Sequence, residues 1–122
     1  MFAMKSYAGK HLICDFQDIP SFDLDLKTMC KELCELHHFE ILGEVEHVFQ
    51  PQGYTLLFLL SESHLSLHTF PEKKYISFDL YTCREYPDNA VYLAIYEWLC
   101  TKMSARGTYH IIDRVFNETI SK

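Results

Sequence analysis

Two short segments of alternating apolar and polar residues, 64–70 and 75–83, constrain the fold of this chain most strongly. A period of two places successive side chains on opposite faces of a β-strand, so each segment is predicted to be a strand with one buried face. The four residues between them, 71–74, are few enough to join the strands as a hairpin. The buried face then carries Leu65, Leu67, Ile76, Phe78 and Leu80, and the other face carries His64, Ser66, His68, Phe70, Tyr75, Ser77, Asp79, Tyr81 and Cys83.

The rest of the chain predicts four more strands and two helices. Apolar residues recur at helical spacing from about Leu24 to His38, with Asp23 or Ser21 as the expected N-cap. A second helix is expected to begin near Pro87. The further strands are expected at 10–17, 39–49, 54–61 and 108–116, and the apolar stripe of the second helix at Val91, Ala94, Ile95, Trp98 and Leu99.

The element order β-α-β-β-β-β-α-β predicts an α+β fold. It is a two-layer sandwich in which two helices cover one face of an antiparallel sheet. The other face of the sheet carries aromatic and polar side chains, such as His64 and Tyr81, and needs cover. We expect the same face of a second copy to provide it, so that two sheets pack face to face in a homodimer.

Composition restricts the classes of partner. The chain has 122 residues, which is one domain, and 48% of them are hydrophobic, which is enough for one core. The formal net charge of −6 argues against a nucleic-acid partner. The five cysteines form no CxxC pair and are typical of a reducing compartment. With no signal-peptide pattern and no apolar run near the ~20 residues of a membrane span, we expect a cytoplasmic protein without a membrane partner.

Reactive side chains are concentrated in residues 61–72, which hold two histidines, three serines and two glutamates. If residue 70 pairs with residue 75 in the hairpin, position 62 lies opposite Cys83. The Cys83 thiol is then expected beside the peptide bond between Glu62 and Ser63. The same register leaves His68 several residues from Ser63, unless the chain bends there.

Four interpretations of this segment are open from the residues alone. It can be an ordinary hairpin with a polar face. A metal site is disfavoured, since His64 and His68 lie about 13 Å apart along an extended strand, and we expect no metal. A nucleophilic enzyme using Cys83 with a histidine lacks a supporting signature. The fourth is self-processing, in which the Ser63 hydroxyl reaches the Glu62 carbonyl.

Residues 62–83, ESHLSLHTFPEKKYISFDLYTC, resemble the core signature of the prokaryotic S-adenosylmethionine decarboxylase proenzyme family. That signature runs roughly ESH-hydrophobic-S/T-hydrophobic-HTWPE, then a strand, then D-x-(F/Y)-TCG. The upstream HVFQPQGYT, residues 47–55, is similar to the family's HxFxPxGVS. The GKH at 9–11 and the ARG at 105–107 also fall where the family has similar short motifs, so the resemblance covers nearly the whole chain.

The resemblance implies that the precursor cuts itself between Glu62 and Ser63, which converts Ser63 into a covalent pyruvoyl cofactor. Residues 1–62 would then form the β chain and residues 63–122 the α chain. His68 matches the histidine that assists processing. Thr55 stands at a serine position that supports processing and retains the hydroxyl. Cys83 matches the proton donor in decarboxylation.

The implied reaction is decarboxylation of S-adenosylmethionine, through a Schiff base between the pyruvoyl group and the substrate amine, for spermidine synthesis. Phe49 and Phe70 match aromatic residues that sandwich the adenine, and Glu72 matches the glutamate that holds the ribose hydroxyls. The active sites of the family lie at a homodimer interface, which agrees with the uncovered sheet face.

Departures from the family pattern lie near the substrate positions. Phe70 stands where the family usually has tryptophan, and Arg84 replaces the glycine after the cysteine. Two alternatives therefore stay open beside the main hypothesis. One is a pyruvoyl-dependent decarboxylase of arginine or ornithine, and the other is an unprocessed, non-catalytic homologue.

Overall fold

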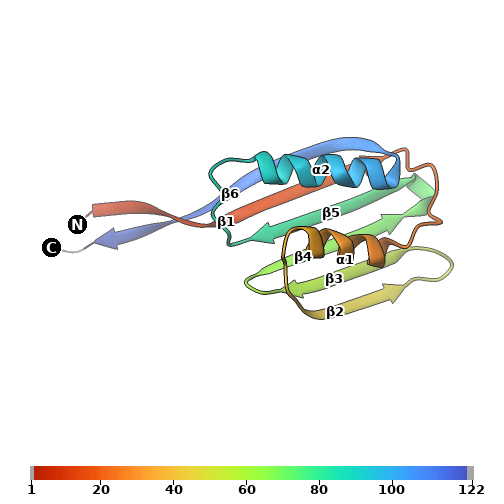
Figure 1. The fold of residues 1–122 in the computed structure, drawn as a ribbon, viewed down its shortest axis with the longest axis horizontal. Coiled ribbons are helices and arrows are strands. Elements are labelled where there is room, and N and C mark those ends of the chain that lie inside the picture. Colours follow the sequence, from red (N-terminus) through yellow and green to blue (C-terminus); the bar gives the residue numbers. More distant parts are fainter. Residues whose placement is uncertain (1, 121–122) are drawn as a thin grey trace.

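The computed structural model describes residues 2–120 and contains one sheet with two α-helices (Figure 1). Their order along the chain confirms the predicted one, and a 3₁₀ turn at Pro71–Lys73 joins β4 to β5. The strands are β1 (Phe2–Gln17), β2 (Ile41–Val48), β3 (Tyr54–Leu60), β4 (Ser63–Phe70), β5 (Tyr75–Thr82) and β6 (Arg106–Ile120), and the helices are α1 (Leu26–Leu36) and α2 (Ala90–Met103).

The sheet is antiparallel, with the strand order β2-β3-β4-β5-β1-β6. The β4–β5 hairpin has the predicted register, because Phe70 lies opposite Tyr75 and His68 lies opposite Ser77. Neighbouring strands of β4 are therefore β3 and β5, and β1 lies next to β5 although it comes first in the chain. This crossover places side chains of β1 beside those of the hairpin.

The first and last strands are longer than the sequence pattern predicts. β1 and β6 pair from Gln17 opposite Arg106 out to Phe2 opposite Ile120. Figure 1 shows them running past the other strands as a two-stranded arm. Pairing of the two strands forms backbone hydrogen bonds whatever side chains are present, so hydrophobic alternation alone did not reveal the extra length of β1 and β6.

Helix α1 confirms the predicted apolar stripe except at Leu36, which is exposed, and it does not confirm the predicted N-cap. The cap is Asp25, whose carboxylate accepts hydrogen bonds from the backbone N–H of Thr28 at 3.0 Å and from its hydroxyl at 2.8 Å. Asp23 and Ser21 were therefore the wrong choice, because the helix begins two residues later than the apolar pattern suggested. The residues that α1 buries are Leu26, Met29, Cys30, Leu33 and Cys34.

Helix α2 buries Ile95 and Leu99 as predicted, but the rest of its buried stripe differs from the prediction. Val91 and Trp98 are only half-buried and Ala94 is exposed, whereas Tyr92 and Tyr96 are buried. The two tyrosines can be buried because each hydroxyl has a partner. The Tyr92 hydroxyl lies 2.7 Å from Thr82 Oγ1, and the Tyr96 hydroxyl donates to the carbonyl of Gly107 at 2.9 Å.

Both helices lie against the same face of the sheet (Figure 1), which confirms the two-layer α+β arrangement. Within residues 2–120 no helix covers the opposite face, which we call the open face. Large apolar side chains are exposed there, among them Val45 (66% exposed), Leu57 (44%), Leu59 (59%) and Ile112 (43%). Neither helix of the described chain is long and apolar enough to cross a membrane.

Candidate active site

The β4–β5 hairpin brings Ser63 and Cys83 to one end of the sheet, as the register predicts. Ser63 is the first residue of β4 and pairs with Thr82, the last residue of β5, so Cys83 follows directly. Ser63 and Cys83 line the same cavity of about 310 Å³, which we call the junction pocket. Its lining residues are His38, Glu40, Ser61, Glu62, Ser63, Cys83 and Arg84.

The peptide bond between Glu62 and Ser63 lies in a strained turn. Leu60 pairs with Ser63, so only Ser61 and Glu62 connect β3 to β4. Glu62 has a φ of 59°, in the left-handed region that residues with a side chain rarely adopt. Such a conformation costs on the order of 1–3 kcal/mol. Backbone strain is therefore stored next to the bond where cleavage is expected.

Cys83 is the one exposed cysteine of the five. Burial raises the pKa of the Cys14 thiol to about 12 and that of the Cys34 thiol to about 11, so both stay protonated and unreactive near neutral pH. The Cys83 sulfur lies 3.8 Å from the Tyr81 hydroxyl, and this contact, together with desolvation, raises the pKa of Tyr81. The thiol in the junction pocket is thus the accessible one.

Arg84 forms one wall of the junction pocket and ties it to the end of α1. Its guanidinium donates to the backbone carbonyls of His37 and His38, each at 2.5 Å, and to the Tyr86 hydroxyl at 3.2 Å. It also stacks on Phe39, with 3.9 Å between Cζ and the ring centroid. The sequence identified Arg84 only as a departure from the family glycine, because its carbonyl partners His37 and His38 are more than 40 residues away.

A second cavity, of about 480 Å³, lies at the other end of β4, and we call it the aromatic pocket. Thr55 and His68 meet inside it, with 2.9 Å between Oγ1 and Nδ1. The pocket unites all the residues to which the family resemblance assigns substrate binding or support of processing. Its lining residues are Phe49, Gln50, Gln52, Gly53, Thr55, His68, Thr69, Phe70 and Glu72.

The side chains of the aromatic pocket are held by neighbours. Phe70 stacks on Tyr75, with 5.5 Å between ring centroids, and the Phe49 ring meets His47 edge to face at 4.5 Å. The Gln52 amide donates to the Glu72 carboxylate at 3.3 Å. Phe49 is 47% exposed and Phe70 is 37% exposed, so both rings have free surface to offer.

One chain does not bring Ser63 and His68 together. Five residues of β4 separate them, which is about 17 Å along a strand. The pairing of β4 with β3 and with β5 runs without a register shift, so the strand makes no bend near Ser63. Ser63 is also buried on the helix side, like Leu65, whereas His68 is half-buried on the open face.

Comparisons with known proteins identify the family. The S-adenosylmethionine decarboxylase family model matches residues 10–112. The chain is 37% identical over 95 residues to the S-adenosylmethionine decarboxylase proenzyme of Prochlorococcus marinus (strain MIT 9211), which covers 73% of this chain and 78% of that protein. It is 35% identical over 82 residues to the proenzyme of the same name from Clostridium botulinum (strain Loch Maree / Type A3), covering 63% of this chain and 70% of that one.

A solved structure agrees. The crystal structure of the adenosylmethionine decarboxylase from Aquifex aeolicus VF5 superimposes with a TM-score of 0.77 at 25% identity, covering 96% of this chain and 98% of that chain. Sequence and fold therefore lead to the same conclusion and confirm the resemblance noted in residues 62–83: this chain belongs to the S-adenosylmethionine decarboxylase family.

Proposed function

We propose that this protein is a self-processing decarboxylase that converts S-adenosylmethionine to decarboxylated S-adenosylmethionine and carbon dioxide. The junction pocket carries the proposal, because Ser63 follows a left-handed Glu62 there and shares the cavity with the exposed thiol of Cys83. The family name supports the substrate, and the relatives named proenzymes support a precursor that is processed. We place the reaction in the cytoplasm and its product in spermidine synthesis.

Processing is proposed at the bond between Glu62 and Ser63. The Ser63 hydroxyl attacks the Glu62 carbonyl carbon, and the amide becomes an ester as the nitrogen takes up the proton. Loss of the Ser63 Cα proton then breaks the Cβ–O bond and frees residues 1–62 with a new C-terminal carboxylate. Water hydrolyses the dehydroalanine left at position 63, with loss of ammonia, to a pyruvoyl group. Residues 1–62 are the β chain and residues 63–122 the α chain.

The junction pocket fits a pyruvoyl group at position 63. Such a group is an electron sink for the electrons left behind by carbon dioxide. Position 63 is buried, which keeps bulk water away. The nearby Cys83 thiol is accessible, and a thiol can donate a proton. The role of Cys83 is to return a proton to the substrate carbon. Arg84 holds the pocket wall through its bonds to the end of α1.

The aromatic pocket is proposed to bind the adenosyl part of the substrate. The free surfaces of Phe49 and Phe70 suit stacking on both sides of an adenine ring, and their π faces attract a sulfonium cation. Glu72 offers carboxylate oxygens to the ribose hydroxyls. His68, held by Thr55, is the acid–base group that assists processing.

These two pockets are too far apart in one chain to form one site, so we propose that a homodimer completes it. The open faces of two chains pack together about a two-fold axis that runs across the strands. The junction pocket of one chain then faces the aromatic pocket of the other, and Ser63 is served by His68 of the partner subunit. The exposed apolar side chains of the open face, such as Leu57 and Leu59, support this packing.

Carbon dioxide release from carboxyl-labelled substrates tests the function. Processed enzyme should release it from S-adenosylmethionine and not from arginine or ornithine, and Phe70→Ala should raise the KM by about tenfold or more because stacking is lost. Release from arginine or ornithine instead would replace the proposed substrate but keep the reaction class. A fully processed chain that decarboxylates none of the three would contradict the proposal.

A further inference from the structure

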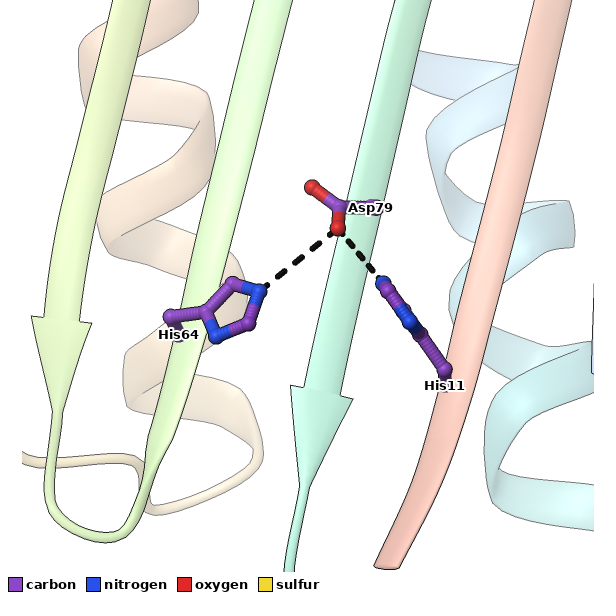
Figure 2. A group of neighbouring side chains, drawn as sticks. All are labelled: His11, His64 and Asp79. Atoms are coloured by element: carbon purple, nitrogen blue, oxygen red, sulfur yellow. Dashed lines mark hydrogen bonds and ion pairs between the residues drawn. The ribbon is translucent and has the colours of Figure 1, made fainter. Parts of the chain in front are cut away.

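Three side chains on the open face converge on one point in front of the sheet (Figure 2). They come from three adjacent strands: His64 from β4, Asp79 from β5 and His11 from β1. Nε2 of His11 lies 2.5 Å from Oδ2 of Asp79, and Nε2 of His64 lies 3.6 Å from the same oxygen. The possible metal-ligand atoms of His11, His64 and Asp79 all lie within 4.8 Å of one another.

Neighbouring side chains hold Asp79 and His64 in place. The Ser66 hydroxyl donates to Oδ1 of Asp79, so the other oxygen, Oδ2, is the one aimed at both histidines. The His64 ring stacks on Tyr81, with 5.7 Å between centroids, and the Tyr81 hydroxyl donates to the carbonyl of Ala8. Outer contacts of this kind orient the ligands of metal sites.

The chemistry of the three groups suits a divalent transition-metal ion. Two imidazoles and one carboxylate form a common set of protein ligands for zinc, at about 2.0–2.2 Å from the ion. Ligand atoms around a tetrahedral ion then lie roughly 3.4 Å apart. The His64–Asp79 distance already matches, and the His11–Asp79 contact has to open by about 1 Å.

We infer that His11, His64 and Asp79 form a binding site for zinc or a similar divalent transition-metal ion. In the single chain the three side chains are partly exposed, at 18%, 50% and 23% respectively, so each can offer its ligand atom to an ion in front of the sheet. The net charge of −6 favours the approach of a cation. On binding, Nε2 of His11 turns its lone pair to the ion, and the single proton of the neutral ring is carried on Nδ1.

The inferred site is separate from the proposed chemistry. None of its three residues lines the junction pocket or the aromatic pocket. Because the site lies on the open face, an ion bound there sits between the two sheets of the proposed dimer. The sequence pattern does not reveal this site, because His11 lies on β1, which becomes a neighbour of the hairpin only in the folded sheet.

Titration calorimetry with zinc chloride at pH 7.5 tests the inference. The full chain carrying Ser63→Ala and Cys83→Ser is used, since it stays uncut and lacks the exposed thiol, and the result does not depend on processing. Zinc should bind with one ion per chain. His64→Gln and Asp79→Asn should each weaken binding at least tenfold, and Ser66→Ala about tenfold.

His110→Gln is the matched control, because His110 is an exposed histidine of β6 on the same face. It should change zinc affinity less than twofold, and His64→Gln, whose side chain is half-exposed, should leave the fold intact by circular dichroism. A parent chain that binds no zinc overturns the inference. Binding that is equally tight in His64→Gln, or that His110→Gln weakens as much, overturns it as well.

Discussion

The Thr55 hydroxyl and the His68 ring meet across the β3–β4 ladder, with 2.9 Å between Oγ1 and Nδ1. The contact holds His68 at the aromatic pocket, on the open face of the sheet. Ser63, on the same strand, lies at the other end and on the other side. His68 is therefore placed away from Ser63 of its own chain, and in the proposed dimer we expect it to act on Ser63 of the second chain.

Processing in mixed dimers tests this arrangement. We expect His68→Ala to abolish or greatly slow cleavage in homodimers, because the acid–base group is missing. When it is co-expressed with Ser63→Ala, the His68→Ala chain should be cut, because the partner subunit's His68 is intact. With random pairing about half of those chains sit in mixed dimers and are cut, as counted by mass spectrometry.

The co-expressed Ser63→Ala chain serves as the internal control, since it must stay whole. A His68→Ala chain that is never cut in a mixed dimer, shown to form by affinity tags, would argue that each chain processes itself. Cleavage of His68→Ala homodimers at the normal rate would remove His68 from processing altogether.

Relief of strain at Glu62 should slow processing. In the uncut Ser63→Ala background, Glu62→Gly should raise the free energy of unfolding by about 1 kcal/mol, because glycine adopts a left-handed φ without a steric cost. With Ser63 present, the same change should slow cleavage, which is followed by gel electrophoresis. Asp18→Gly is the matched control: its φ of 55° is also left-handed, so it should stabilise the chain similarly but leave the cleavage rate unchanged.

Cys83 should be the only thiol that reacts quickly in the folded protein. Iodoacetamide at pH 8 is expected to label one cysteine per chain, because Cys83 is exposed while burial holds the pKa of Cys14 near 12 and that of Cys34 near 11. Cys83→Ser should lose the fast label and lower carbon dioxide release by about 10²–10⁴-fold. Peptide mapping gives the labelled site, and fast labelling at Cys14 or Cys34 would contradict the account.

Arg84 should stabilise the junction pocket. We expect Arg84→Gly to lower the free energy of unfolding by about 2 kcal/mol, because two charge-assisted hydrogen bonds to His37 and His38 are lost. Arg84→Lys should recover only part of this lost free energy of unfolding, since an ammonium cannot bond both carbonyls as the planar guanidinium does. Urea denaturation of uncut Ser63→Ala chains measures the free energy of unfolding of each variant. Equal stability of the chains with Arg84, Arg84→Gly and Arg84→Lys would rule out a stabilising role for Arg84.

Arg84→Gly should also change the pKa of His37. Burial, then Arg84 and His38, lower the pKa of His37, so the folded state prefers its neutral form and stability falls as the pH drops below about 6.5. Without Arg84 the pKa of His37 should rise, although burial still holds it down. NMR titration of the His37 ring checks this, and an unchanged pKa would show that Arg84 does not lower the pKa of His37.

Alternation of side chains was enough to predict the hairpin, its register and the two-layer class, because a period of two fixes which face each residue occupies. The position of Cys83 beside Ser63 followed from the same register. The buried face of α2 was predicted in part: Ile95 and Leu99 are buried, but the pattern left out Tyr92 and Tyr96, whose hydroxyls are satisfied by Thr82 and Gly107.

Features that depend on distant segments were beyond the sequence pattern. The bonds of Arg84 to His37 and His38, and the approach of His11 to Asp79, exist only because the fold brings separate parts of the chain together. The distance between Ser63 and His68 was visible in the hairpin register. That this distance calls for a second chain follows only from the structure, in which β4 pairs without a register shift and the open face is uncovered.

The intact mass of the purified, denatured protein shows whether the chain cleaves itself between Glu62 and Ser63. We predict two chains, residues 1–62 and residues 63–122, with the second blocked at its first residue by a pyruvoyl group. Ser63→Ala should give one whole chain, and Ser61→Ala, which changes the other serine of the junction pocket, should be cut like the parent. One uncut chain from the parent sequence, stable on long incubation, or a cut at any other bond, would contradict the account.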